Sequence, residues 1–250
     1  MQPTEHLSSA HLSKVLTRKK KVLNLAVFGS KSGSNLTAIL CAQKKEKNIH
    51  VKVVVTDRKC NCQNIARAEG IPLIYLSYKS IKEKYPQDYH LVYEDKLLEK
   101  LKTFQIDYVV LAGYMRLIKG SILRAFKGRI INVHPSDLTY KVNQKRAYIG
   151  ANAVELALKE GKKKTRSSVI FIDEGVDTGP ILVSGPWVFY QGKHPVDDTS
   201  IELHQERQKY ISDHPALIKA INILQSKEVT LVNGKIYIEG KRLSSCGYEM

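Results

Sequence analysis

Asn132, His134 and Ser136 interrupt the apolar segment INVHPSDL at residues 131–138, where a buried strand would continue with apolar side chains. Polar groups at such a place cost free energy unless they are hydrogen-bonded or take part in chemistry. Imidazole titrates nearest to neutral pH, so His134 is a candidate general acid or base. Asn132, on the same face of a strand, could stabilise an oxyanion on the same carbonyl. The alternative is a hydrogen-bonded histidine at a strand end, with the asparagine capping a turn.

A second polar segment, IDEGVDTGP at residues 172–180, follows another apolar run and is rich in turn residues. A carboxylate from this segment could orient the imidazole of His134 and stabilise its positive charge. Its aspartates could instead cap turns or hold Mg²⁺, although the segment lacks the frame of an EF-hand.

The segment GSKSGSN at residues 29–35 follows an apolar run and precedes a helical pattern. Backbone N–H groups at the start of a helix attract anions. The spacing matches neither the P-loop nor the dinucleotide fingerprint, so a phosphate monoester is the better guess. The alternative is a simple turn in which Ser34 or Asn35 caps the helix.

These segments need a scaffold that brings strand ends together. Strand candidates are residues 22–28, 51–56, 71–76, 108–113, 129–134 and 167–172, and helix candidates are residues 35–47, 64–70, 91–104 and 151–161. Continuous apolar runs suit strands covered on both faces, so we expect an α/β fold with a mostly parallel twisted sheet and helices on both faces. Ligands bind outside the carboxyl ends of such strands. This rule selects the segments that follow residues 28, 113, 134 and 172.

The last third of the chain changes pattern. A strand candidate at residues 181–190, interrupted by Gly and Pro, leads to a helical stretch from Thr199 to Leu224 that we expect to break at Pro215. The pair Asn233-Gly234 between alternating apolar residues predicts a C-terminal β-hairpin. We expect a flexible basic leader, one domain, and a hairpin extension packed on that domain, over residues 1–21, 22–228 and 229–250.

The 250 residues carry a net charge of +16, with a hydrophobic fraction of 43% that is usual for soluble globular proteins. This charge attracts phosphorylated small molecules and nucleic acids alike, but the basic residues are scattered without interleaved aromatics, so a nucleic-acid partner is not expected. No apolar run approaches the roughly 18 residues of a membrane span, and the leader lacks the apolar core of a signal peptide. We expect a cytoplasmic protein. The four cysteines suggest neither a disulfide nor a metal site.

Four segments, in this order and spacing, together resemble the glycinamide ribonucleotide formyltransferase family, within the superfamily of folate-dependent formyltransferases. They are SGSNL (32–36), VVLAGYMRLI (109–118), INVHPSDL (131–138) and DEGVDTGPIL (173–182). The resemblance covers residues 22 to about 190. It implies a Rossmann-like formyltransferase domain over residues 22–228. The implied reaction moves a formyl group from the co-substrate 10-formyltetrahydrofolate to the amine of glycinamide ribonucleotide in purine biosynthesis, without a metal.

The resemblance also implies site residues. In the catalytic trio, protonated His134 and the amide of Asn132 would stabilise the oxyanion, while Asp177 would keep the imidazole cationic and help to move a proton. The substrate phosphate would bind to the turn formed by Ser32, Gly33 and Ser34. The folate would contact Met115, Arg116, Leu117, Ile118, Asn132, Asp173, Glu174 and Val176.

The chain departs from the family pattern mostly on the acceptor side. After HPS, the segment DLTYKVNQKRAYIGANAV (137–154) replaces the usual Leu-Pro and aromatic-Pro-Gly stretch. The family places a Glu five residues before the proline that corresponds to Pro215, to hold the ribose hydroxyls, and here that position is Tyr210. Further departures are Lys31 and Arg166, where Gly is usual, and Ile170, where a second His is common.

These departures leave three other functions open. A formyltransferase of the same fold could act on another amine, such as an amino sugar or a nucleotide-linked amine. A folate-dependent deformylase could use the same oxyanion stabilisation with water as the acceptor. A basic nucleic-acid-binding or scaffold protein could keep the fold without the chemistry, and a steep salt dependence of binding would favour it.

Overall fold

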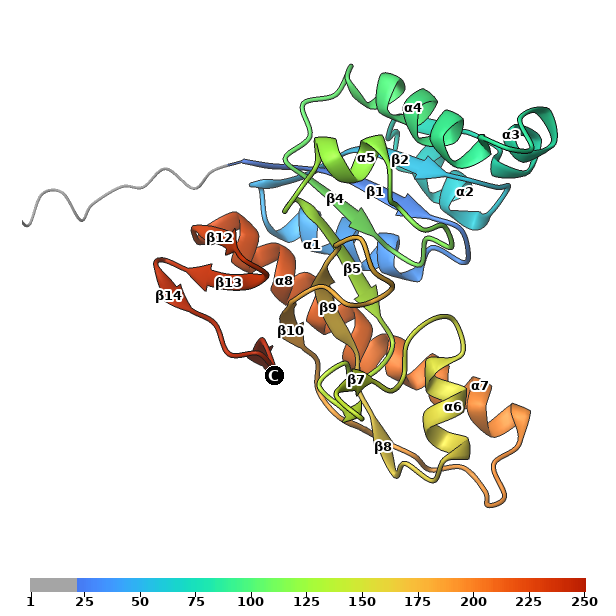
Figure 1. Ribbon diagram of the computed structural model, residues 1–250, viewed down its shortest axis with the longest axis vertical. Helices are drawn as coiled ribbons and strands as arrows, with labels where there is room; N and C mark the ends of the chain where they lie inside the picture. Colours follow the sequence, from blue (N-terminus) through green and yellow to red (C-terminus); the bar gives the residue numbers. More distant parts are fainter. Residues whose placement is uncertain (1–21) are drawn as a thin grey trace, which may run out of the picture.

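The computed structural model describes residues 22–250, so the expected basic leader lies outside the described residues (Figure 1). An 8-stranded sheet with the order β15-β10-β9-β5-β4-β1-β2-β3 forms its centre. The strands are β1 (Leu23–Gly29), β2 (Ile49–Thr56), β3 (Leu73–Tyr75), β4 (Tyr108–Leu111), β5 (Ile130–His134), β9 (Ser168–Phe171), β10 (Ile181–Ser184) and β15 (Tyr248–Glu249). Each of the six predicted strand runs overlaps one of these strands, and β1 and β2 extend one and two residues beyond their predicted runs.

The sheet is mostly parallel, as predicted. Strand β9 runs antiparallel to both of its neighbours, β5 and β10, and the other adjacent pairs in this sheet are parallel. The register of β5 and β9 pairs His134 with Ser168 and Ile131 with Phe171. The carboxyl end of β9 therefore points away from His134.

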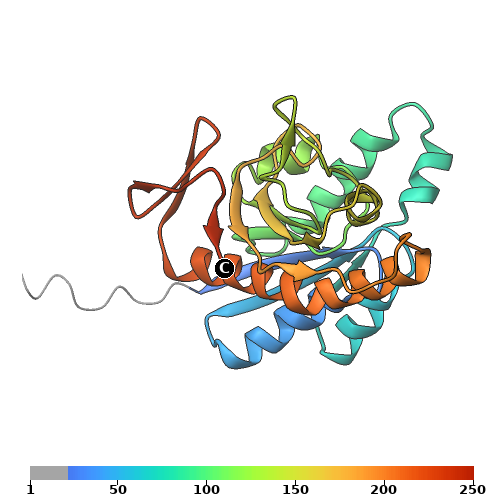
Figure 2. The same ribbon diagram turned by 90° about the horizontal axis from the view of Figure 1, so that it is seen from below.

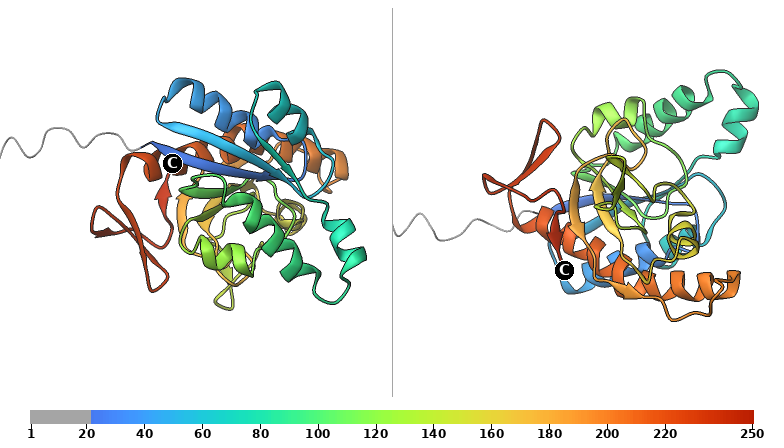
Figure 3. Two further views of the ribbon diagram at one scale, coloured as in Figure 1. Left: turned by 90° about the horizontal axis from the view of Figure 1, so that it is seen from above. Right: turned by 60° about the horizontal axis from the view of Figure 1, so that its bottom comes forward.

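Helices cover both faces of the sheet, because the apolar side chains of the strands alternate between two cores. On β1, Leu25 and Val27 belong to the core under α1 (Ser34–Lys45), α2 (Asn61–Ala68) and α8 (His214–Ser226), whereas Ala26 and Phe28 belong to the core under α4 (Tyr89–Leu101) and α5 (Ser121–Ala125). Figure 3 shows helices on both faces of the sheet. The helices are α1 (Ser34–Lys45), α2 (Asn61–Ala68), α3 (Tyr78–Lys84), α4 (Tyr89–Leu101), α5 (Ser121–Ala125), α6 (Ala153–Lys159), α7 (Asp198–Gln208) and α8 (His214–Ser226).

The long helical stretch is continuous, and the predicted break at Pro215 is wrong. A π-helical turn, η2 (Lys209–Asp213), joins α7 to α8, and Pro215 occupies the first turn of α8. A proline removes one backbone donor and crowds the preceding turn, and a wider turn relieves that conflict without ending the helix. The π turn also contains one residue more than an α turn, which shifts the side chains that follow.

The predicted hairpin consists of β12 (Val229–Val232) and β13 (Lys235–Ile238), and β14 (Lys241–Arg242) adds a third strand. Asn233 and Gly234 have φ of 49° and 69°, the left-handed conformation that this tight turn requires. This small sheet projects from one end of the molecule (Figure 2). The chain then returns, and β15 pairs with the edge strand β10. Two further strand pairs are β6 (Lys141–Val142) with β7 (Lys145–Arg146), and β8 (Lys164–Thr165) with β11 (Val188–Phe189). Within residues 22–250 no helix is both long and apolar enough to cross a bilayer.

Candidate active site

A crevice of about 410 Å³ opens at the carboxyl ends of β1, β4 and β5, where the rule for α/β sheets places a ligand. Among the side chains that line it are those of Asn132, His134 and Asp177. The structure thus brings together three residues that the sequence assigned to catalysis. Of the other residues assigned to the site, Ser32, Gly33, Ser34, Met115, Arg116, Leu117, Ile118 and Val176 also line this crevice.

His134 ends β5 and is 4% exposed, so its ring is held by protein groups on both sides. Its Nε2 atom lies 3.0 Å from the backbone carbonyl oxygen of Tyr148, and its Nδ1 atom lies 3.4 Å from Oδ2 of Asp177. Since a carbonyl can only accept, Nε2–H is the donor of the first bond. The second contact is an ion pair when the ring carries both protons. Both ring nitrogens are therefore engaged by protein groups at the edge of the crevice.

Asp177 reaches His134 from a loop that doubles back across the sheet. The strand-end rule selected residues 172–180 on the expectation that the preceding strand is parallel to its neighbours. That expectation is wrong, because β9 is antiparallel to β5 and ends at the opposite edge of the sheet from His134. The loop returns with Asp177 in the left-handed region, at φ of 52°. Its Oδ2 accepts a hydrogen bond of 2.9 Å from the backbone N–H of Gly150, and Arg146 donates to its backbone carbonyl oxygen. A strained conformation held by several contacts is common at functional sites.

The polar side chains of the segment INVHPSDL divide between the site and the scaffold. Asn132 is half-buried and faces the crevice. Ser136 is buried outside the crevice lining, and its hydroxyl donates a 2.5 Å hydrogen bond to the carbonyl oxygen of Tyr148, the same oxygen that His134 contacts. Ser136 therefore fixes a hydrogen-bond partner of the histidine.

The turn before α1 presents backbone and side-chain polar groups to the crevice. Gly33 caps the helix with φ of 81°, and a Cβ atom there would lie 2.6 Å from Cδ1 of Ile65, so only glycine suits both the conformation and the space. Neither Ser34 nor Asn35 caps the helix by a side-chain hydrogen bond, since they lie inside it. The Oδ1 atom of Asn35 is buried and has no hydrogen-bond partner within residues 22–250. Lys31 also lines the crevice, so the turn offers an ammonium beside the helix N-terminus.

Another part of the crevice lining is apolar. Met115, Leu117, Ile118 and Val176 contribute to it, and this surface suits a flat ring system. Asp173 and Glu174 are exposed and do not line the crevice. The carboxylate of Asp173 instead accepts hydrogen bonds from the Gly175 backbone N–H at 3.1 Å and the Thr178 hydroxyl at 2.6 Å, and it thereby shapes the loop that carries Asp177.

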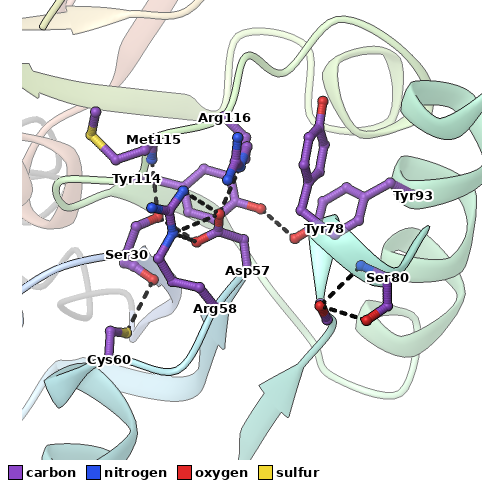
Figure 4. Close-up of polar contacts among 12 residues, drawn as sticks. Ser30, Asp57, Arg58, Cys60, Tyr78, Ser80, Tyr93, Tyr114, Met115 and Arg116 are labelled. Atoms are coloured by element: carbon purple, nitrogen blue, oxygen red, sulfur yellow. Dashed lines mark hydrogen bonds and ion pairs between the residues drawn. The ribbon is translucent and has the colours of Figure 1, made fainter. Parts of the chain in front are cut away.

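Arg116 is tied to a buried carboxylate that the sequence analysis missed. Asp57, directly after β2, accepts hydrogen bonds from Nε of Arg116 at 2.7 Å, from the Ser30 hydroxyl at 2.6 Å and from Arg58 at 3.1 Å (Figure 4). Ser30 in turn accepts from the backbone N–H of Met115 at 3.0 Å. Burial raises the pKa of Asp57, but the hydrogen bonds from Ser30, Arg58 and Arg116 outweigh it and hold that pKa below its usual range. This network fixes the loop after β4 against the ends of β1 and β2.

The π turn decides which side chains close the other end of the crevice. Lys209, Gln208 and Asp213 line it, whereas Tyr210, which stands where the family pattern has a glutamate, is 65% exposed. Asp213 accepts a hydrogen bond from the Ser167 hydroxyl, and burial raises the pKa of its carboxyl group. The sequence analysis identified none of these three residues as part of the site.

The fold and the crevice define an α/β protein whose strand-end crevice combines the polar side chains of Asn132, His134 and Asp177 with apolar residues and with the turn at the start of α1. Residues 23–218 match the family model described as formyl transferase. The chain belongs to this family.

Named relatives agree with that assignment. The phosphoribosylglycinamide formyltransferase of Bacillus subtilis is 38% identical over 160 residues, which are 63% of this chain and 75% of that protein. The trifunctional purine biosynthetic protein adenosine-3 of Drosophila melanogaster is 33% identical over 223 residues, which are 87% of this chain but 15% of that protein's length. The structure of the phosphoribosylglycinamide formyltransferase of Coxiella burnetii superposes with a TM-score of 0.76 at 25% identity, covering 92% of this chain and 99% of that one.

Proposed function

We propose that this protein transfers a formyl group from 10-formyltetrahydrofolate to the amine of glycinamide ribonucleotide, a step of purine biosynthesis. The observation that carries the proposal is the placement of Asn132, His134 and Asp177 in one crevice with the turn at residues 31–35 and the apolar residues of the lining. Membership of the formyl transferase family and the names of the relatives support it. We further propose that residues 22–228 form the catalytic domain, with residues 229–250 as an extension. The cytoplasmic location and the lack of a nucleic-acid partner remain predictions.

The reaction forms one C–N bond and breaks another. The acceptor amine attacks the formyl carbon, and the carbonyl oxygen becomes an oxyanion. The amide of Asn132 and the imidazolium of His134 stabilise this charge. The amine then loses a proton, N10 of the folate gains one, and the C–N10 bond breaks. Asp177 is paired with His134 and holds the positive charge on its ring. Asp177 also lines the crevice, where its carboxylate can pass the proton from the amine to N10 through a water.

The two substrates divide the crevice. We assign the folate ring to the apolar wall formed by Met115, Leu117, Ile118 and Val176, with Arg116 as an anchor of that wall through Asp57. Asp173 and Glu174 act on the folate through the shape of their loop. We assign the phosphate of the acceptor to Ser32, Gly33 and Ser34 at the start of α1. Lys31 adds a positive charge there, whereas Lys209, at the end closed by the π turn, is paired with Glu206.

A formyl-transfer assay tests the proposal. Purified protein is mixed with 10-formyltetrahydrofolate and glycinamide ribonucleotide, and the appearance of deformylated folate is followed beside an acceptor-free control. We expect turnover that requires the ribonucleotide. Turnover without an acceptor would indicate a deformylase, and transfer only to an amino sugar or a nucleotide-linked amine would replace the acceptor. Folate binding without any turnover would contradict the catalytic assignment.

A further inference from the structure

A second cavity, of about 280 Å³, is lined by residues of α6, of β8 and of the segment at residues 136–148. Figure 1 shows α6 and β8 side by side in the lower part of the molecule. Val154 is the one residue that lines both cavities, so the two cavities are neighbours. This cavity is bounded by the segment after HPS, in which the sequence departs from the family pattern. None of the residues assigned to the transfer reaction lines it.

The walls of this second cavity are flat and mostly apolar. The rings of Tyr140 and Tyr148 stack with their centroids 5.5 Å apart and their planes 9° from parallel. The ring of Trp187 forms another wall, and Ala153 and Ala157 of α6 leave room by their small side chains. Aromatic rings prefer offset or edge contacts with other rings, so such walls favour a planar aromatic guest. The volume limits that guest to a small molecule.

Positive charge surrounds the same cavity. The Nζ atom of Lys162 lies 3.7 Å from the centre of the Tyr140 ring, and that of Lys164 lies 4.2 Å from the centre of the Trp187 ring. Together with Lys163 they line the cavity, and none of the three has an ion-pair partner among residues 22–250.

The carboxylate of the lining, Asp137, does not offset these lysines. Its Oδ1 is paired at 3.1 Å with Nε of Arg166, whose guanidinium also stacks 4.4 Å from the Trp187 ring centre. Arg166 is itself buried, so this pair stays in place. The remaining charge of the cavity is positive, and it favours an anion over a cation.

We propose that this cavity binds a small planar aromatic carboxylate, with its ring against Tyr148, Trp187 and Ala157 and its carboxylate beside Lys162 and Lys164. The lysines then exchange a contact with a ring face for a charge-assisted hydrogen bond, which is stronger. The site is separate from the formyl-transfer crevice, and binding to it does not depend on the proposed reaction.

Trp187 is the sole tryptophan of the sequence, so its indole N–H gives a single reporter inside the cavity. We would label the indole nitrogen with ¹⁵N and titrate the protein with naphthalene-2-carboxylate, following the indole cross-peak. The isosteric carboxamide and carboxamidine serve as neutral and cationic probes. We expect a saturable shift with the carboxylate, about tenfold weaker binding of the carboxamide, and still weaker binding of the carboxamidine.

Two variants locate the carboxylate and one controls for charge. K162Q and K164Q should each bring the carboxylate affinity towards that of the carboxamide and leave the carboxamide affinity unchanged. K52Q removes an exposed lysine of β2 and should change neither. A157L should fill the cavity and abolish binding of both probes. Because A157L could unfold the protein, K162Q and K164Q provide the decisive test of the proposal. Any of three results would overturn the proposal. They are the absence of a saturable shift, equal affinity for the carboxylate and the carboxamidine, and an unchanged ratio of carboxylate to carboxamide affinity in both lysine variants.

Discussion

The carboxylate of Asp177 lies 3.4 Å from Nδ1 of His134 while the same oxygen accepts the backbone N–H of Gly150. The aspartate is thus fixed by the chain before any substrate arrives. Replacing His134 by Ala or Asp177 by Asn should lower kcat by about 10² to 10⁴ and leave folate binding nearly unchanged, because both groups act mainly in the transition state. Steady-state kinetics with equilibrium folate titration checks this. The control is H50A on the exposed side of β2, and wild-type rates in H134A or D177N would remove the assignment.

Lys31 should matter for one substrate only. It lines the crevice beside the turn at the start of α1, so K31Q should raise KM for the phosphorylated acceptor by about tenfold, the value of one charge-assisted contact. KM for 10-formyltetrahydrofolate should not change. K47Q, which removes an exposed lysine, serves as the charge control. An equal rise of both KM values would show that the variant disturbs the turn as a whole.

We expect Asp57 to contribute both to the stability of the fold and to the binding of the folate. D57N leaves Arg116 and the buried Ser30 without their anionic partner, and loss of one member of a buried charge network costs about 3 kcal/mol. Urea unfolding should show this loss, and KM for the folate should rise because the loop at Met115 loses its anchor. The native pKa of Asp57 is lowered, so its contribution is complete above the unfolded pKa of about 4 and is lost as the pH falls through the native value. A D57N protein as stable as wild type at pH 7 would contradict this role.

His204 should make the fold sensitive to mild acid. Its Nε2 lies 2.7 Å from the Thr165 hydroxyl, and its buried Nδ1 has no hydrogen-bond partner within residues 22–250. A second proton, on Nδ1, would therefore find no hydrogen-bond acceptor there. Burial first, and then the positive Arg207, lowers the pKa of His204 to about 4. The unfolded chain binds this proton below about pH 6.5, so the contribution of His204 is complete above that pH and falls as the pH drops towards 4.

The measurement for His204 is the free energy of unfolding at pH 7.5 and at pH 5. Wild type should lose more stability between these values than H204Q, which has no imidazole to protonate. H50Q, at an exposed histidine, should lose as much as wild type. Equal losses in wild type and H204Q would show that His204 does not cause the sensitivity.

The sequence predicts the scaffold better than the contacts within the site. Apolar runs located β1 to β5 and β9, but periodicity carries no direction, so the antiparallel course of β9 and the returning path of Asp177 could not be seen. Asp57 could have been found, because it follows β2 at the sheet edge that supplies the other site residues. The π turn could not, since a single extra residue leaves the helical pattern of the flanking segments intact. The role of Asp177 came from the resemblance, and the structure supplies its distance to His134.

The carbonyl oxygen of Tyr148 accepts hydrogen bonds from both His134 and Ser136. A substrate oxygen that accepts a hydrogen bond from Nε2–H must therefore displace the Tyr148 carbonyl oxygen and not a water molecule. This carbonyl belongs to the protein itself and is present at a high effective concentration. The measured affinity for the substrate then reflects the difference in free energy between the hydrogen bond from His134 to the substrate and the one from His134 to Tyr148. Changes in the segment at residues 137–149 that loosen Tyr148 would then tighten binding of such a substrate without touching it.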